Sequence, residues 1–122
     1  MYNTDNQLII DTIVFSSLAT VTFEKGSQLE YIGDYVFFGC MALMTVDMSA
    51  CAQVQTLGQS AFDGDQELRL FKIGTETPPT CKGYPFYGIN PYSVLKVPSG
   101  CVDAYKAASG WKSFASITGL DE

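Results

Sequence analysis

The chain repeats its own apolar pattern at an interval of 25 residues. Each apolar landmark between Leu29 and Leu43 recurs between Val54 and Leu68, and two glycines recur with them. The matched pairs are Leu29 with Val54, Ile32 with Leu57, Phe37 with Phe62, Leu43 with Leu68, Gly33 with Gly58 and Gly39 with Gly64. A fixed period of about 20–50 residues is the signature of repeat proteins, in which each unit stacks on its neighbours. The repeat therefore predicts a solenoid.

Short alternating segments extend the repeat and predict its strands. The alternating apolar pairs are Val21 and Phe23, Val46 and Met48, Phe71 and Ile73, and Leu95 and Val97. Alternation marks a strand with one buried face, and a single strand cannot bury that face alone. We therefore expect four strands in a parallel ladder, with Tyr31–Ile32 and Thr56–Leu57 returning on the opposite side. Phe37 and Phe62 are expected to be fully buried.

Two copies of the repeat resemble a known motif. The segments from Ile32 to Leu43 and from Leu57 to Leu68 are similar to I-G-x-x-A-F-x-G-C-x-x-L, the motif of the BspA-like leucine-rich repeats of bacterial surface proteins. The first copy has Val36 where alanine is usual. The segment from Thr77 to Phe114 is similar to the closing segment of that family. The resemblance covers about Leu18 to Gly119.

The resemblance implies a leucine-rich repeat solenoid. Such a fold is right-handed, with a parallel sheet on one face and irregular or short-helical return segments. We expect one domain over residues 1–122: a degenerate coil or cap at 1–17, about four repeats of 24–25 residues at 18–100, and a C-terminal helical cap at 101–122. In this end region Pro98 is expected to stop strand pairing, Ser99 to cap a helix, and Trp111 to anchor the cap.

Composition excludes several classes of function. The chain of 122 residues has no histidine, which removes Ser–His–Asp and Cys–His catalysis and histidine-ligated zinc. Seven basic residues against thirteen acidic ones, a net charge of −6, argue against nucleic-acid binding. No apolar run approaches the roughly 18–20 residues that span a bilayer. We assign no catalytic residue, metal or cofactor. Most of the four cysteines are interpreted as buried free thiols, with a disulfide as the alternative.

The function expected from the resemblance is non-catalytic. It implies a protein-binding or adhesion module of a bacterial cell-surface or secreted protein, which binds a protein or host-matrix ligand as a monomer or with weak self-association. Met1 to Asn6 show no signal peptide, so the extracellular location rests on the resemblance. The alternative is a purely structural piece, the last coils and cap of a longer array whose binding face lies upstream.

Two surfaces are candidates for binding. The first is the outward face of the sheet, with a central row and a flanking row: Thr22, Asp47, Lys72 and Lys96, and Thr45 and Leu70. Its alternative interpretation is an ordinary solvated ladder between Asp47 and Lys72. The second is an aromatic loop stiffened by Pro85 and Pro91, with three tyrosines: Tyr84, Tyr87 and Tyr92. The segment from Asp63 to Glu67 lacks the ligand spacing of a calcium loop, so it is interpreted as a solvated turn.

Overall fold

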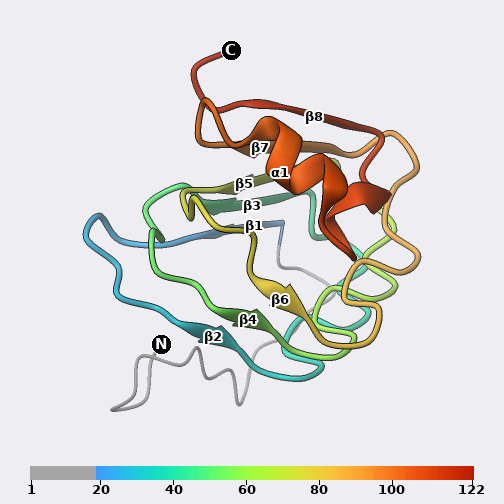
Figure 1. Cartoon of the computed structure of the whole chain (residues 1–122). Helices are drawn as coiled ribbons and strands as arrows, with labels where there is room; N and C mark the ends of the chain where they lie inside the picture. The colour runs from blue at the N-terminus through green and yellow to red at the C-terminus, as the bar shows by residue number, and fades with distance from the viewer. Residues whose placement is uncertain (1–18) are drawn as a thin grey trace.

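The computed structural model describes residues 19–122, so the predicted N-terminal unit at 1–17 lies outside the described residues. The chain forms a parallel-strand β-solenoid of about four turns (Figure 1). Its larger sheet has five strands in the order β1-β3-β5-β7-β8. These strands are β1 (Thr20–Thr22), β3 (Thr45–Met48), β5 (Leu70–Ile73), β7 (Val94–Val97) and β8 (Ser116–Gly119). All the neighbouring strands are parallel.

The return segments form a second sheet on the opposite side of the core (Figure 1). This sheet contains β2 (Tyr31–Ile32), β4 (Thr56–Leu57) and β6 (Thr80–Cys81), and all its strands are parallel. The sequence predicted irregular or short-helical returns here. Short strands form instead because each coil places its return segment directly beside that of the next coil, where backbone groups can pair.

The strand register follows the sequence repeat. Val21 lies beside Val46, Val46 beside Phe71, and Phe71 beside Leu95. The predicted parallel ladder of four strands is therefore confirmed. The inward residues of β3, β5 and β7 are buried and alternate with partly exposed ones, which is the pattern of a sheet with one face on the core.

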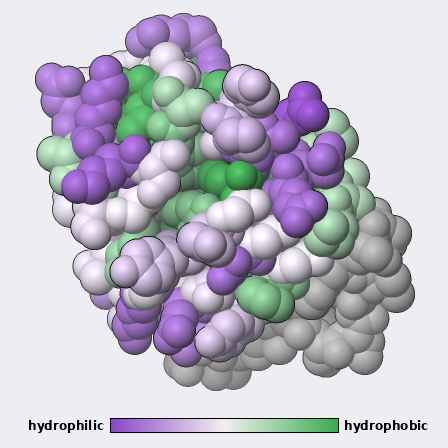
Figure 2. Space-filling view, turned by 90° about the vertical axis from the view of Figure 1, so that its right-hand side faces the viewer, coloured by the Kyte–Doolittle hydropathy of each residue, from purple (hydrophilic) through white to green (hydrophobic). Residues whose placement is uncertain are grey.

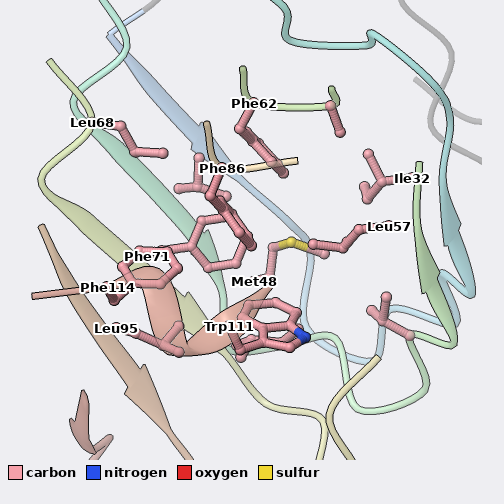
Figure 3. Close-up of a cluster of buried hydrophobic side chains, with 14 of the residues drawn as sticks. Ile32, Met48, Leu57, Phe62, Leu68, Phe71, Phe86, Leu95, Trp111 and Phe114 are labelled. Atoms are coloured by element: carbon pink, nitrogen blue, oxygen red, sulfur yellow. The ribbon is translucent and has the colours of Figure 1, made fainter. Parts of the chain in front are cut away.

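Phenylalanines stack along the core from coil to coil (Figure 3). Phe37 and Phe62 are 1% and 0% exposed, which confirms that both are core residues. The ring centroids of Phe37 and Phe62 are 5.3 Å apart, and those of Phe62 and Phe86 are 5.6 Å apart, in both cases with nearly parallel planes. Phe71 from β5 meets Phe62 edge-on at 5.1 Å. Such pairs stabilise beyond the area that they bury.

The glycines of the repeat allow close contact between coils. A Cβ atom at Gly58 would lie only 2.4 Å from the carbonyl carbon of Gly33 in the preceding coil. Gly39, Gly64 and Gly88 all have positive φ angles, of 66°, 80° and 75°, a conformation that glycine adopts at little cost. The recurrence of these residues therefore has a steric cause.

The C-terminal segment packs on the last coil (Figure 1). It consists of α1 (Val102–Ala107), the short 3₁₀ helix η2 (Trp111–Ser113) and β8. Trp111 and Tyr105 are both 0% exposed. The indole N–H of Trp111 donates to the carbonyl oxygen of Pro79 at 2.8 Å, and the hydroxyl of Tyr105 donates to the backbone carbonyl oxygen of Thr75 at 2.6 Å. The two side chains thus join this segment to the coil that contains β5 and β6, which is the third coil of the described chain.

Two expectations for this region are wrong. Pro98 ends β7 but does not stop strand pairing, because β8 returns beside β7 and places Leu95 next to Ile117. Ser99 does not cap α1, because the residue before the helix is Cys101 and no side chain caps it. The hydroxyl of Ser99 instead donates to the carboxylate of Asp121. The chain passes through another turn between Pro98 and the helix, so Ser99 lies too early.

Candidate functional site

The sheet face brings the predicted row together. Thr22 lies beside Asp47, Asp47 beside Lys72, and Lys72 beside Lys96. Thr118 of β8 extends the row by one position, a residue that sequence reasoning missed because β8 departs from the repeat. The flanking positions Thr45 and Leu70 are also paired, and both are partly buried. Leu70 in turn lies beside Val94, which is also partly buried.

Much of the polar chemistry on this face is already satisfied within the chain. The carboxylate of Asp47 accepts hydrogen bonds from the backbone N–H and the hydroxyl of Ser49, at 3.0 and 2.6 Å. Partial burial raises the pKa of Asp47, but these two bonds and the nearby Lys72 outweigh it and hold the pKa below its ordinary value. The ammonium of Lys96 donates to the carbonyl oxygen of Glu122.

Asp47 and Lys72 do not form an ion pair. Within residues 19–122, the ion pair with a nitrogen–oxygen distance under 4 Å is the one between Arg69 and Glu67, at 3.8 Å. Both of these side chains are largely exposed. Exposed pairs of this kind contribute about 0–1 kcal/mol. Among the described residues, the central row of the sheet face is therefore a regular row of polar side chains with no ion pair between neighbours.

The predicted aromatic loop is the most exposed aromatic surface in the described chain. We name it the tyrosine loop (residues 84–92). Its tyrosines Tyr84, Tyr87 and Tyr92 are 77%, 70% and 80% exposed. The loop backbone is nevertheless anchored to the core, because Pro85 and Phe86, between Tyr84 and Tyr87, are buried. Figure 2 views the side of the molecule on which the turns of the coils lie, where small apolar areas appear between hydrophilic ones.

A hollow of about 290 Å³ lies between the tyrosine loop and the C-terminal segment. The loop side is formed by residues 84–91 and the opposite side by Gly110 and Ser113. None of the lining side chains is charged. Sequence reasoning did not find this hollow, because its two walls are about 25 residues apart and meet only in the folded chain.

A second hollow of about 560 Å³ lies on the other side of the coils, along residues 52–55 and 74–80. Backbone groups here are paired across the coils. The N–H of Val54 donates to the hydroxyl of Thr75 at 3.2 Å, and that hydroxyl donates to the carbonyl oxygen of Cys51 at 2.8 Å. The N–H of Thr80 donates to the backbone carbonyl oxygen of Gln55 at 2.9 Å. These contacts hold the fold together.

Asp65 is buried, and its interpretation as part of a solvated turn is wrong. It is 0% exposed, and one carboxylate oxygen accepts the backbone N–H of Cys40 from the preceding coil at 2.7 Å. The other oxygen, Oδ2, has no partner among the described residues. Burial raises the pKa of Asp65 to about 8, against the lowering effect of the hydrogen bond from Cys40. The local sequence resembles a polar turn, but the bonding partner lies 25 residues earlier.

All four cysteines are free thiols. Cys40 and Cys51 are buried, and Cys81 and Cys101 are partly exposed. Burial, with a smaller contribution from Asp65, raises the pKa of Cys40 to about 12, which makes it a poor nucleophile at neutral pH. Residues 19–122 bring no three acidic, cysteine or histidine side chains together as a metal site. They also contain no helix with the length and apolar character needed to cross a membrane.

A comparison with protein-family models, curated proteins and solved structures finds no match to this chain. The class that the fold defines is a parallel β-solenoid with two sheets.

Proposed function

We propose that the chain is a non-catalytic protein-binding module that contacts its partner through the tyrosine loop. The observation that carries this proposal is the exposure of Tyr84, Tyr87 and Tyr92, each between 70% and 80%, on a loop anchored by buried Pro85 and Phe86. Large exposed aromatic side chains on a fixed backbone are typical of contact surfaces. The ring of Phe86 stacks on Phe62, and its centroid lies 5.1 Å from that of the Trp111 ring, so the core holds the loop in place.

Tyrosine suits this role for a physical reason. Its ring buries a large apolar area while its hydroxyl can donate or accept a hydrogen bond at the edge of an interface. It has few rotatable bonds, so little conformational entropy is lost when it is fixed. The outward sheet face is the second contact surface in this proposal, because its rows are regular and rigid.

The repeat motif supports a more specific assignment. We infer that the solenoid is of the BspA-like leucine-rich repeat type, from a bacterial cell-surface or secreted protein, with α1 and η2 as its helical cap. The proposed partner is a protein or matrix component outside the cell. Trp111 and Tyr105 support the cap, since both are fully buried against the third coil and a solenoid needs its last coil covered.

The test is binding of the chain to a panel of purified extracellular matrix proteins by biolayer interferometry. Three proteins are compared: the wild type, a loop variant with Tyr84→Ser, Tyr87→Ser and Tyr92→Ser, and a sheet variant with Thr22→Ala, Asp47→Ala, Lys72→Ala and Lys96→Ala. We expect the loop variant to lose at least tenfold in affinity and the sheet variant to lose less. Equal binding by the wild type and the loop variant would reject the tyrosine loop as the contact surface.

A structural role is the second candidate, and one observation favours it. The C-terminal segment covers one end of the solenoid (Figure 1). This is the position that the cap on the last coils of a longer array would take. Binding by a longer parent chain, with none by this chain at the same concentration, would support the structural role.

A further inference from the structure

Backbone hydrogen bonds connect the turns of successive coils. We name the first turn (residues 35–39), the second turn (60–64) and the third turn (84–88), which are equivalent in the repeat. The N–H of Phe37 donates to the carbonyl oxygen of Ala61 at 2.8 Å. The N–H of Gly39 donates to the carbonyl oxygen of Asp63, also at 2.8 Å. Two donors two residues apart in the first turn thus bind two carbonyl oxygens two residues apart in the second.

The second turn binds the third in the same way. The N–H groups of Phe62 and Gly64 donate to the carbonyl oxygens of Pro85 and Tyr87, both at 2.8 Å. The stacked phenylalanine rings and the positive φ of each glycine recur with the bonds. Because the pattern is the same at both steps, the donors of every turn face the C-terminal end of the solenoid.

The third turn has no following turn to bind. The equivalent donors are the N–H groups of Phe86 and Gly88, and no residue in the described range 19–122 accepts a hydrogen bond from either. Both residues line the hollow of about 290 Å³, which the C-terminal segment closes only on the far side with Gly110 and Ser113. The C-terminal segment therefore covers the core and leaves a backbone-binding position open beside it.

We propose that this hollow binds a main-chain segment of the partner protein, with two carbonyl oxygens two residues apart on the N–H groups of Phe86 and Gly88. This inference rests on the proposed function, because it names the chemistry of the partner at the tyrosine loop. The bound segment takes the place that the third turn itself occupies on the second turn. Recognition through backbone groups, with neighbouring side chains adding specificity, is a common mode of peptide binding.

The lining favours a neutral peptide over an anion. A carboxylate or phosphate needs a positive partner to offset its loss of hydration, and no charged side chain lines the hollow. A peptide carbonyl is a neutral acceptor that two backbone donors match directly. Tyr84 and Tyr87 stand at the rim with 77% and 70% exposure, so they can close over the bound side chains.

The test is an NMR titration of the ¹⁵N-labelled chain with a synthetic peptide. The peptide has the sequence of residues 83–89, Gly-Tyr-Pro-Phe-Tyr-Gly-Ile, because this segment occupies the equivalent position on the second turn. We expect the amide protons of Phe86 and Gly88 to move downfield on saturation, while those of Phe62 and Gly64 stay fixed. The control peptide carries thioamides, which are weaker hydrogen-bond acceptors, in place of the two carbonyls that correspond to Pro85 and Tyr87. No movement of the Phe86 and Gly88 amides, or equal movement with the control peptide, overturns the inference.

A matched pair of variants tests the hollow itself. Ser113→Trp fills the hollow from its far wall, whereas Ser109→Trp adds the same bulk at an exposed position outside the lining. We expect Ser113→Trp to weaken peptide binding at least tenfold and Ser109→Trp to change it less than twofold. Equal effects overturn the inference.

The two proposals fail in different ways. If a matrix protein binds through the tyrosines but leaves the amide protons of Phe86 and Gly88 unchanged, the main-chain site is wrong and the protein-binding function stands. If the peptide moves these amides but the panel shows no binding that depends on the tyrosines, the site is real and the proposed function fails.

Discussion

Asp65 gives a test of how the coils are joined. Its carboxyl group is 0% exposed, accepts one backbone N–H from Cys40 at 2.7 Å, and leaves Oδ2 without a partner in the described chain. Burial disfavours the charged form and raises the pKa of Asp65 to about 8. In an unfolded chain the pKa of an aspartate is about 3.9. Between these two pKa values, the folded protein therefore keeps a proton on Asp65 that the unfolded chain has released.

The sign of the effect on stability follows from this difference in bound protons. Between about pH 4 and pH 8 the folded state binds one proton more than the unfolded state, so stability falls as pH rises. One proton corresponds to a slope of at most about 1.4 kcal/mol per pH unit. From about pH 5 to pH 7 the wild type is expected to lose about 2–3 kcal/mol, a large part of the roughly 5–15 kcal/mol typical of a domain.

The substitution Asp65→Asn isolates this contribution. Asparagine keeps an oxygen for the N–H of Cys40 and cannot ionise, so we expect the fall in stability between pH 5 and pH 7 to disappear. The control is Asp103→Asn, which makes the same substitution at an exposed position of α1 and should keep the wild-type slope. Asp47 and Asp121, whose pKa values are lowered, change protonation below pH 5, and Cys40, whose pKa is raised, changes protonation above pH 7.

Urea unfolding at several pH values, followed by circular dichroism, measures the slope for the three proteins. A wild type whose stability does not fall with pH, or an Asp65→Asn variant with the wild-type slope, would refute the assignment of a protonated carboxyl group at this position.

Three further substitutions test the packing of the coils by urea unfolding. Phe62→Ala removes a fully buried ring from the stack and should cost about 3–5 kcal/mol, whereas Phe38→Ala, at a side chain that is 50% exposed, should cost under about 1 kcal/mol; equal losses contradict the register. Gly58→Ala places a Cβ atom 2.4 Å from backbone of the preceding coil and should cost about 1–3 kcal/mol; a neutral result argues against this close approach. Tyr105→Phe removes the buried hydrogen bond to Thr75 and should cost about 1–3 kcal/mol; wild-type stability shows that the bond contributes nothing.

The repeat predicts the stacking of the coils because side chains that share a position share a steric environment. The interval of 25 residues placed Val46 beside Phe71 and Asp47 beside Lys72, as the structure confirms. The tyrosines of the loop were also found from sequence, since Tyr84, Tyr87 and Tyr92 cluster beside two prolines in a short segment.

The features that sequence reasoning missed depend on contacts between distant segments. β6 follows two prolines, Pro78 and Pro79, and so does not look like a strand, yet it pairs with β4. β8 breaks the repeat spacing, and its strand form comes from pairing with β7. The burial of Asp65 and the unpaired N–H groups of Phe86 and Gly88 depend on the neighbouring coil. A local sequence pattern does not reveal that neighbour.

Site-specific photo-crosslinking tests the tyrosine loop as the contact surface most directly. One protein carries p-benzoylphenylalanine in place of Tyr87, and a second carries it in place of Lys72 on the sheet face. Each is irradiated with the matrix protein that the wild type binds, and the cross-linked product is identified by mass spectrometry. Binding through the tyrosine loop predicts a cross-link from position 87 and little or none from position 72. A cross-link from position 72 alone would contradict it.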